Sequence, residues 1–371
     1  CPLNSLDGYS PRWILRQLGL DMGTREDLDQ AVWACLTCNT CGALCPRGID
    51  IVDITRAVRR RNVEGDYITD RFELPLHSLK HHNNPWSAPP EKRMDWNRDL
   101  TIPGYTPEHK YCLFTCCTTA YDATFSKKSA AAAEAFPRLL RLAGIDFGTL
   151  GLEEACCGDP AHILGDQTLA RELRDRNSRL FLSRKVKQIV TTSPHCLDTF
   201  RKNYPELDGR LTCEHYVELL DWLLAKGRLK PVRQIDSRVC FHDPCYLGRY
   251  NTIFDAPRRV LSAIPGLDLV EMIDCRESSL CCGGGGGGAW GTHPADKGVG
   301  SLRVRQALET GADVIATACP YCARMLNQAI QTVKAHDRII VRDVAALLFD
   351  AVLPEMETTP LERTSQEIIH A

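Results

Sequence analysis

The chain has 371 residues, enough for about two or three domains, and its 45 basic and 47 acidic side chains leave a formal charge of −2. This balance argues against a protein whose main role is to bind nucleic acid or an anionic membrane surface. With 44% apolar and 25% charged residues, the composition is that of a folded globular protein rather than a disordered one. No uninterrupted apolar run reaches about 18 residues, so we expect no membrane-spanning helix.

Cysteine is the exceptional residue, with 19 copies in the chain. A disulfide framework fits poorly, because the count is odd, the chain is long and many cysteines are adjacent or separated by two residues. Clustered thiolates at such spacings are typical of metal sites. At this point both an iron–sulfur protein and a zinc-stabilised scaffold protein remain open.

Residues 1–75 have a helical pattern. One helix is predicted to begin at Asp27, and a second spans about 51–62. Between them lies a cysteine run of the form C-x2-C-x2-C-x3-C-P, which is typical of a cubane [4Fe–4S] cluster. Its members are Cys35, Cys38, Cys41 and Cys45, followed by Pro46.

The first two residues, Cys1-Pro2, look like the end of another such run. In two-cluster ferredoxins the fourth cysteine of each run ligates the other cluster. We therefore assign Cys1 to one cubane together with Cys35, Cys38 and Cys41. Cys45 then belongs to a second cubane whose other ligands lie upstream. Residues 1–75 are interpreted as the C-terminal part of an α-helical two-cluster ferredoxin domain, and the numbered chain as a fragment.

Two segments carry few signals of regular structure. Residues 76–110 contain five prolines from Pro85 to Pro107 and are predicted to be a Pro-rich linker or ordered loop without a helix. Residues 354–371 are predicted to form an exposed tail.

Residues 111–232 and 233–353 form an internal repeat. The second copy has Cys245, then Cys281-Cys282-Gly283, then Cys319-x2-Cys322. The first copy has Cys117, then Cys156-Cys157-Gly158, then Ser193-x2-Cys196, at offsets of 128, 125 and 126 residues. Such a spacing does not recur by composition alone, so the sequence predicts two related domains.

The setting of these cysteines predicts α/β domains. Ile189–Thr192 and Val314–Ala318 have the pattern of buried strands, and each runs into a Pro-containing turn and a helical stretch. The cysteines would then lie at the carboxyl ends of strands, where α/β sheets bind ligands. Gly283–Gly288 follow the cysteine pair, and Gly283 and Gly284 are candidate cofactor-binding residues whose N–H groups could point at sulfides.

At these residues the sequence resembles the CCG cysteine-rich domain family of iron–sulfur oxidoreductases. Its members include heterodisulfide reductases with a fused catalytic chain of the D type, the K subunit of a sulfite-reduction-linked membrane complex, and iron–sulfur electron-transfer-flavoprotein:quinone oxidoreductases. The segment from His242 to Arg249 is similar to a stretch found in that group. The resemblance implies an α-helical [4Fe–4S] ferredoxin domain followed by two pseudo-symmetric α/β CCG domains.

The resemblance also implies a noncubane [4Fe–4S] cluster in the second CCG domain. Its ligands, which would also be the catalytic residues, would be Cys245, Cys281, Cys282, Cys319 and Cys322. His242 is a candidate proton donor beside them. The first motif departs from the family pattern at Ser193, so we expect its site to be altered or empty. An altered site would hold a different cluster on Cys117, Cys156, Cys157 and Cys196, or would recruit Cys116 or Ser193.

The function implied is that of an iron–sulfur redox subunit of a membrane-associated complex. It would pass electrons between a membrane partner carrying quinone or b-haem and a soluble redox partner such as electron-transfer flavoprotein. It would then be cytoplasmic and peripheral on the membrane. The alternative within enzymes is a reductase that cleaves the disulfide or trisulfide of a protein or thiol at the noncubane cluster. Nucleic acid is not an expected partner.

Overall fold

The N-terminal region is helical in the residues that the structure, a computed structural model, describes: 1–3, 10–20, 25–121, 130–291 and 298–352. The helix predicted over 51–62 is confirmed, and the Asp50 side chain caps it by accepting a hydrogen bond from the Asp53 N–H at 2.9 Å. The helix predicted to begin at Asp27 is present, but Arg25 is already helical. The helices are α2 (Pro11–Leu20), α3 (Arg25–Ala34), α4 (Thr40–Ala43), α5 (Ile51–Glu64) and α6 (Asp70–His82).

Helix α6 overturns part of the expectation for the Pro-rich segment. It continues to His82, so the prediction of no helix from residue 76 is wrong for residues 76–82. Phe72, Leu76 and Leu79 recur on one helical face and are buried in the main core, which stabilises the helix. A 3-10 helix, η1 (Pro90–Asn97), follows. In the loop between them the buried Asn84 amide donates to the carbonyls of two neighbouring residues.

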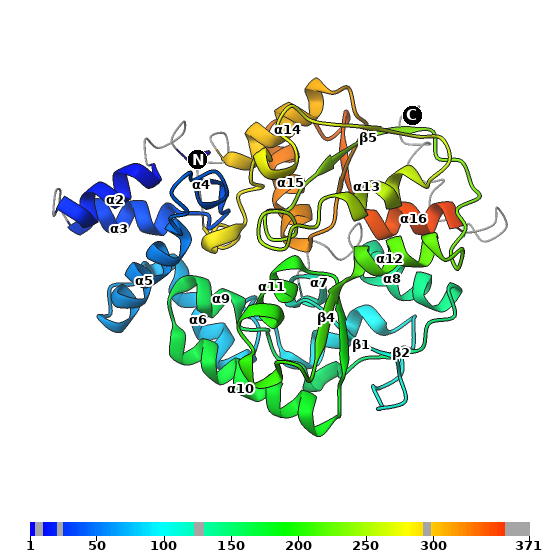
Figure 1. Ribbon diagram of the computed structural model, residues 1–371, viewed down its shortest axis with the longest axis horizontal. Helices are drawn as coiled ribbons and strands as arrows, with labels where there is room; N and C mark the ends of the chain where they lie inside the picture. Colours follow the sequence, from blue (N-terminus) through cyan, green and yellow to red (C-terminus); the bar gives the residue numbers. More distant parts are fainter. Residues whose placement is uncertain (4–9, 21–24, 122–129, 292–297, 353–371) are drawn as a thin grey trace, which may run out of the picture.

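The rest of the chain forms two four-stranded parallel sheets with the same topology (Figure 1). The strand order is β2-β1-β3-β4 in one sheet and β6-β5-β7-β8 in the other. The internal repeat predicted from the cysteine offsets is therefore confirmed as two α/β units. Their strands are β1 (Tyr111–Phe114), β2 (Phe147–Gly148), β3 (Gln188–Thr191), β4 (Thr212–His215), β5 (Ser237–His242), β6 (Leu267–Val270), β7 (Val314–Thr317) and β8 (Ile340–Asp343).

Helices connect and cover these strands, as parallel pairing requires. Those of the first unit are α7 (Cys117–Tyr121), α8 (Ala130–Leu142), α9 (Asp159–Leu164), α10 (Gln167–Ser183), α11 (Pro194–Lys202) and α12 (Tyr216–Ala225). Those of the second are α13 (Asp255–Ser262), α14 (Val299–Glu309), α15 (Pro320–Thr332) and α16 (Val344–Val352). Short 3-10 turns are η3 (Gly151–Glu153), η4 (Pro205–Leu207), η5 (Arg276–Ser278) and η6 (Gly285–Gly287). The predicted tail, 354–371, lies outside the described residues.

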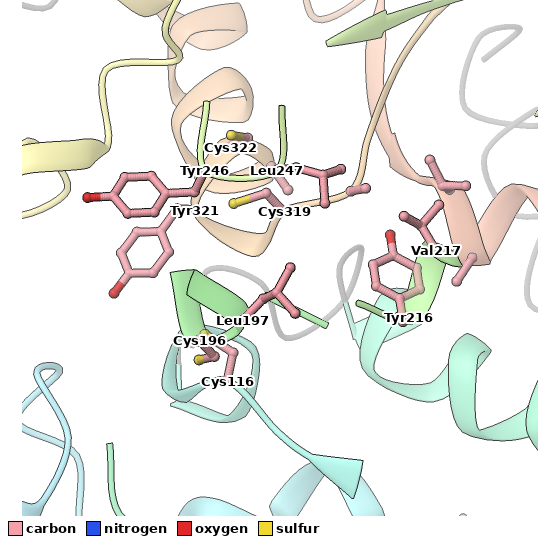
Figure 2. Packing of buried hydrophobic residues seen from close by; sticks show 14 of the residues in the cluster. Cys116, Cys196, Leu197, Tyr216, Val217, Tyr246, Leu247, Cys319, Tyr321 and Cys322 are labelled. Atoms are coloured by element: carbon pink, nitrogen blue, oxygen red, sulfur yellow. The ribbon is translucent and has the colours of Figure 1, made fainter. Parts of the chain in front are cut away.

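The two α/β units pack against each other through α8 and α12 on one side and α13 and α16 on the other (Figure 1). Polar contacts cross this interface: Arg259 pairs with Asp221 at 2.6 Å, and the Tyr216 hydroxyl donates to the Asp343 carboxylate at 2.9 Å. The docking brings the carboxyl ends of the two sheets toward each other, as Figure 2 shows for cysteines of both units.

Candidate metal centres

The second α/β unit gathers its cysteines at the carboxyl ends of its two central strands. Between β5 and β7 the connections diverge to opposite sides of the sheet, which is where α/β folds place ligands. Cys245 follows β5, and Cys319 lies between β7 and α15. A loop after η5 brings in the adjacent pair. All five residues are buried: Cys245, Cys281, Cys282, Cys319 and Cys322.

The five thiols form a continuous series of contacts. Cys245 contacts Cys281, Cys281 contacts Cys282, Cys282 contacts Cys322, and Cys322 contacts Cys319. The contacts from Cys281 and Cys322 hold the pKa of Cys282 well below its usual range, although burial opposes this. Five buried sulfurs packed together fit a metal group, because bound metal supplies the positive charge that allows several buried thiolates to coexist.

His242, the last residue of β5, has its imidazole beside these sulfurs. Its ligand nitrogen and the sulfurs of Cys282 and Cys322 all lie within 4.8 Å of one another. Arg303 Nε donates to His242 Nδ1 at 3.1 Å. A guanidinium can only donate, so Nδ1 is the acceptor and Nε2 carries the proton toward Cys282. Burial and the neighbouring Arg303 lower the pKa of His242, which keeps the ring neutral.

The glycine-rich loop contacts both the sulfurs and the N-terminal region. Gly283 N–H donates to the Cys281 sulfur at 3.3 Å, and a Cβ added at Gly284 would lie 3.6 Å from the Cys282 sulfur. Gly286 has a φ of +61°, and a Cβ there would overlap the Cys35 carbonyl oxygen. The glycines therefore permit a backbone approach that side chains would prevent.

In the N-terminal region four cysteines line one partly open cavity. They are Cys1, Cys35, Cys38 and Cys41. Cys45 is not among the residues that line it, and backbone N–H groups of Ile49 and Arg47 lower the pKa of its thiol. Burial raises the pKa of Cys41 to about 11. Four thiols around one cavity fit the ligand demand of a cubane cluster.

The N-terminal cavity and the second α/β unit meet at their cysteines. The Cys38 thiol contacts the Cys281 thiol, and this contact lowers the pKa of Cys38 to about 5. The surrounding loop is held by Arg249 Nε, which donates to the Cys38 carbonyl at 2.7 Å, and by the Tyr250 hydroxyl, which donates to the Thr37 carbonyl at 2.7 Å. The two groups of thiols are thus adjacent in space.

The first α/β unit has a comparable group. Cys117 contacts Cys156, Cys156 contacts Cys157, and Cys157 contacts Cys196. The fully buried Arg93 donates to the Cys117 sulfur at 3.4 Å and pairs with Glu154 at 2.8 Å. Because this guanidinium is desolvated, its charge acts strongly on the thiol. The Cys116 thiol contacts Cys196 and therefore belongs to the same group.

Rings from both units fill the space between the two thiol groups. His195 stacks on Tyr246 with ring centroids 3.8 Å apart and lies 4.7 Å from Tyr321. Its Nδ1 pairs with the Asp159 carboxylate at 2.9 Å. Burial disfavours the imidazolium, but this carboxylate outweighs it and raises the pKa of His195 to about 10.

A cleft reaches each cysteine pair from outside. One, of about 560 Å³, extends to Cys282 between the glycine-rich loop, α14 and α15. The other, of about 670 Å³, extends to Cys157 at the corresponding place in the first unit. The second cleft is basic, since Arg171, Arg174 and Lys202 line it.

Sequence reasoning missed the arginines of these sites. Arg59, Arg93 and Arg303 are the three largest fully buried side chains in the described part of the chain. Each bonds to groups from distant parts of the sequence, such as the Cys35 and Gly286 carbonyls for Arg59. No local pattern marks such a residue, because a buried arginine looks like any surface arginine until its partners are known.

The comparisons with known proteins agree with this architecture. The cysteine-rich domain family CCG matches residues 111–201 and 239–327, which lie in the two α/β units. A probable iron–sulfur-binding oxidoreductase, FadF, of Bacillus subtilis is 35% identical over 88% of this chain and 47% of its own length. An EtfAB:quinone oxidoreductase of Syntrophomonas wolfei is 32% identical over 87% of this chain and 47% of its own length.

A third relative is covered more completely. The D subunit of the dihydromethanophenazine:CoB–CoM heterodisulfide reductase of Methanosarcina barkeri is 33% identical over 88% of this chain and 79% of its own length. The chain spans only about half the length of the other two relatives.

The paired α/β units with buried thiols at their strand ends, and these relatives, place the chain in a class of proteins named as iron–sulfur oxidoreductases. The chain carries two copies of the CCG cysteine-rich domain and belongs to the same family as the heterodisulfide reductase relative. This class replaces the alternative of a zinc-stabilised scaffold. Within the described residues, no helix has the length and apolar character needed to cross a membrane.

Proposed function

We propose that this chain is the iron–sulfur redox part of a membrane-associated complex and lies on the cytoplasmic face of the membrane. It passes electrons between a membrane partner that carries quinone or b-haem and a soluble partner such as electron-transfer flavoprotein. The observation that carries this proposal is the contact between Cys38 and Cys281, which joins two thiol groups across two domains. The relative named EtfAB:quinone oxidoreductase supports the choice of partners.

The number of cysteines in each group suggests which kind of cluster it holds. We assign a noncubane [4Fe–4S] cluster to the five cysteines of the second α/β unit and a cubane to the four cysteines around the N-terminal cavity. Cys45, outside that cavity, belongs to a second cubane with its other ligands elsewhere. When bound, such clusters supply one-electron oxidation and reduction.

The protein's own residues set the conditions for this chemistry. Burial of the five cysteines excludes water, and the N–H groups of His242 and Gly283 are directed at sulfur. Arg249 and Tyr250 hold the Cys38 loop against the second unit. Residues that keep two redox sites adjacent and dry favour fast electron exchange between them.

Replacement of Cys282 tests the proposal. The variant Cys282→Ala should lose about four iron atoms per chain and stop accepting electrons from reduced electron-transfer flavoprotein in anaerobic stopped-flow measurements. Cys275→Ser, a partly exposed thiol outside the sites, is the matched control and should keep both properties. If Cys282→Ala retained its iron and its electron uptake, the proposed ligand set would be wrong.

The cleft that reaches Cys282 favours a second candidate, a reductase for a disulfide or trisulfide substrate. Reduction of a disulfide consumes two electrons and two protons and releases two thiols. Gln328 is exposed and lines this cleft, whereas the neighbouring Asn327 is exposed but does not line it. A reductase should lose disulfide turnover in Gln328→Trp but not in Asn327→Trp. An electron conduit should be unaffected by either change.

A further inference from the structure

The first α/β unit lacks one thiol in the register of the repeat. Ser193 stands where the second unit has Cys319, so the repeat by itself leaves four cysteines in the first motif. In the second unit Cys319 completes the series of contacts by touching Cys322. The first unit therefore needs another group beside Cys196 if its site is to be complete.

Cys116 supplies a thiol at that place. Its thiol contacts both Cys196 and Ser193. The first unit thus has the series Cys117–Cys156–Cys157–Cys196–Cys116, which matches Cys245–Cys281–Cys282–Cys322–Cys319 contact for contact. Figure 2 shows Cys116 beside Cys196, across from Cys319 and Cys322 of the other unit.

The backbone explains how one turn delivers two thiols. β1 ends at Phe114 and α7 begins at Cys117, so Cys116 lies in the turn between them. The second unit has Pro244 at the corresponding position, which carries no ligand atom. The two side chains diverge: Cys117 contacts Cys156 and Arg93, whereas Cys116 contacts residues at the start of α11.

The surroundings are those of a polar site rather than of a packed apolar core. The Ser193 hydroxyl is fully buried, has no nitrogen or oxygen partner and contacts the Cys116 thiol. Arg93 places a buried positive charge at Cys117. A buried hydroxyl without a nitrogen or oxygen partner costs free energy unless a sulfur atom at the site accepts its hydrogen bond. Thiolates or cluster sulfides would do so.

We propose that the first unit holds its own iron–sulfur cluster on five thiolates, with Cys116 as the ligand that replaces Cys319 of the repeat. The ligand set is Cys116, Cys117, Cys156, Cys157 and Cys196. The proposal rests on the proposed function only in assuming that such five-thiol groups bind iron–sulfur clusters. Of the alternatives expected from the sequence, it selects an altered site that recruits Cys116 over an empty one.

The test compares iron and acid-labile sulfide per chain, together with low-temperature EPR spectra, in variants of the whole chain. Cys116→Ala should lose about four iron atoms, as Cys157→Ala should, and combining the two changes should cause no further loss. Combining Cys116→Ala with Cys282→Ala should double the loss. The EPR signal of the second unit should persist in Cys116→Ala and report that the protein is folded.

A rescue variant separates a ligand from a packing residue. Cys116→Ala combined with Ser193→Cys should regain the lost iron, because the thiol returns at the position of the repeat. Iron loss that Ser193→Cys does not restore would overturn the assignment of Cys116. Full iron content in Cys116→Ala would overturn it as well.

The matched control for these measurements is Cys275→Ser, which should keep all its iron. If Cys116→Ala does not fold, Cys116→Val provides the same comparison, because it fills the space of the thiol and offers no ligand atom. Retention of iron in Cys157→Ala would mean that the first unit is empty. Retention of iron in Cys282→Ala would instead contradict the proposed function. A failure of this inference can therefore be told apart from a failure of the proposed function.

Discussion

At the scale of single residues, the sites depend on hydrogen bonds aimed at sulfur. His242 is fully buried, and Arg303 determines which of its nitrogens carries the proton. The first unit has Phe114 at the position that corresponds to His242. The two thiol groups therefore share their pattern of contacts but differ in their N–H donors, with His242 beside Cys282 in the second unit and Arg93 on Cys117 in the first. Because hydrogen bonds to sulfur stabilise the more negative, reduced form of a cluster, this difference is expected to separate their potentials.

His242→Phe tests this role, because the other unit already accommodates phenylalanine at that position. We expect the midpoint potential of the second-unit cluster to fall by roughly 50 mV, the equivalent of one hydrogen bond. An EPR-monitored redox titration measures it. The exposed His336 gives the control His336→Phe, which should leave the potential unchanged. An unchanged potential in His242→Phe would show that the N–H does not act on the cluster.

At the scale of secondary-structure elements, the glycine-rich loop and helix α5 hold the N-terminal region on the second α/β unit. Arg59 of α5 donates to the Cys35 carbonyl at 2.7 Å and to the Gly286 carbonyl at 2.9 Å. Gly286 can approach so closely because it has no Cβ. The loop therefore acts as a docking surface for the cysteine run as well as a donor of N–H groups to sulfur.

Gly286→Ala should separate these surfaces, because it combines an unfavourable positive φ with a clash against the Cys35 carbonyl. We expect faster loss of iron from the N-terminal site under a chelator and a lower thermal midpoint. Gly48→Ala is the control: its φ is +64°, but an added Cβ meets nothing within 4 Å. Equal effects of the two substitutions would attribute the change to backbone strain alone.

At the scale of the whole molecule, the two α/β units are joined by a contact that responds to pH. The Tyr216 hydroxyl of the first unit donates to the Asp343 carboxylate of the second. Burial raises the pKa of Asp343 to about 6, from an ordinary value of 3.8. The folded protein therefore favours the protonated carboxyl. The stability that the folded protein gains from protonated Asp343 is complete below about pH 4 and is lost as the pH rises through about 6.

Asp343→Asn should remove this pH dependence, because an amide keeps its polar atoms without ionising. We expect the variant to be more stable than the parent at pH 8, by at most about 3 kcal/mol, and similar to it at pH 4. Urea midpoints at the two pH values measure the effect. Tyr216→Phe should move the pH range of this stability loss upward, since it removes a hydrogen-bond donor to the Asp343 carboxylate. A parent protein whose stability does not fall between pH 4 and pH 7 would contradict the assignment.

Much of the architecture follows from local sequence patterns. The offsets of the cysteines predicted two related units, and the structure has two sheets with the same strand order. The helix over 51–62 was predicted correctly as well. The helix that extends to His82 was missed, because its stability comes from burial of Phe72 and Leu79 in a core that other segments build.

The sequence alone identified the candidate residues for the chemistry: thiols grouped at short spacings, repeated at a constant offset and placed after strands. Only the tertiary structure decided how these groups lie relative to one another. The contact between Cys38 and Cys281, the recruitment of Cys116 beside Cys196, and the burial of Arg59 all depend on docking between distant segments. Spacing along a chain reports neighbours within one turn or strand, whereas side chains brought together by packing have no fixed separation in sequence.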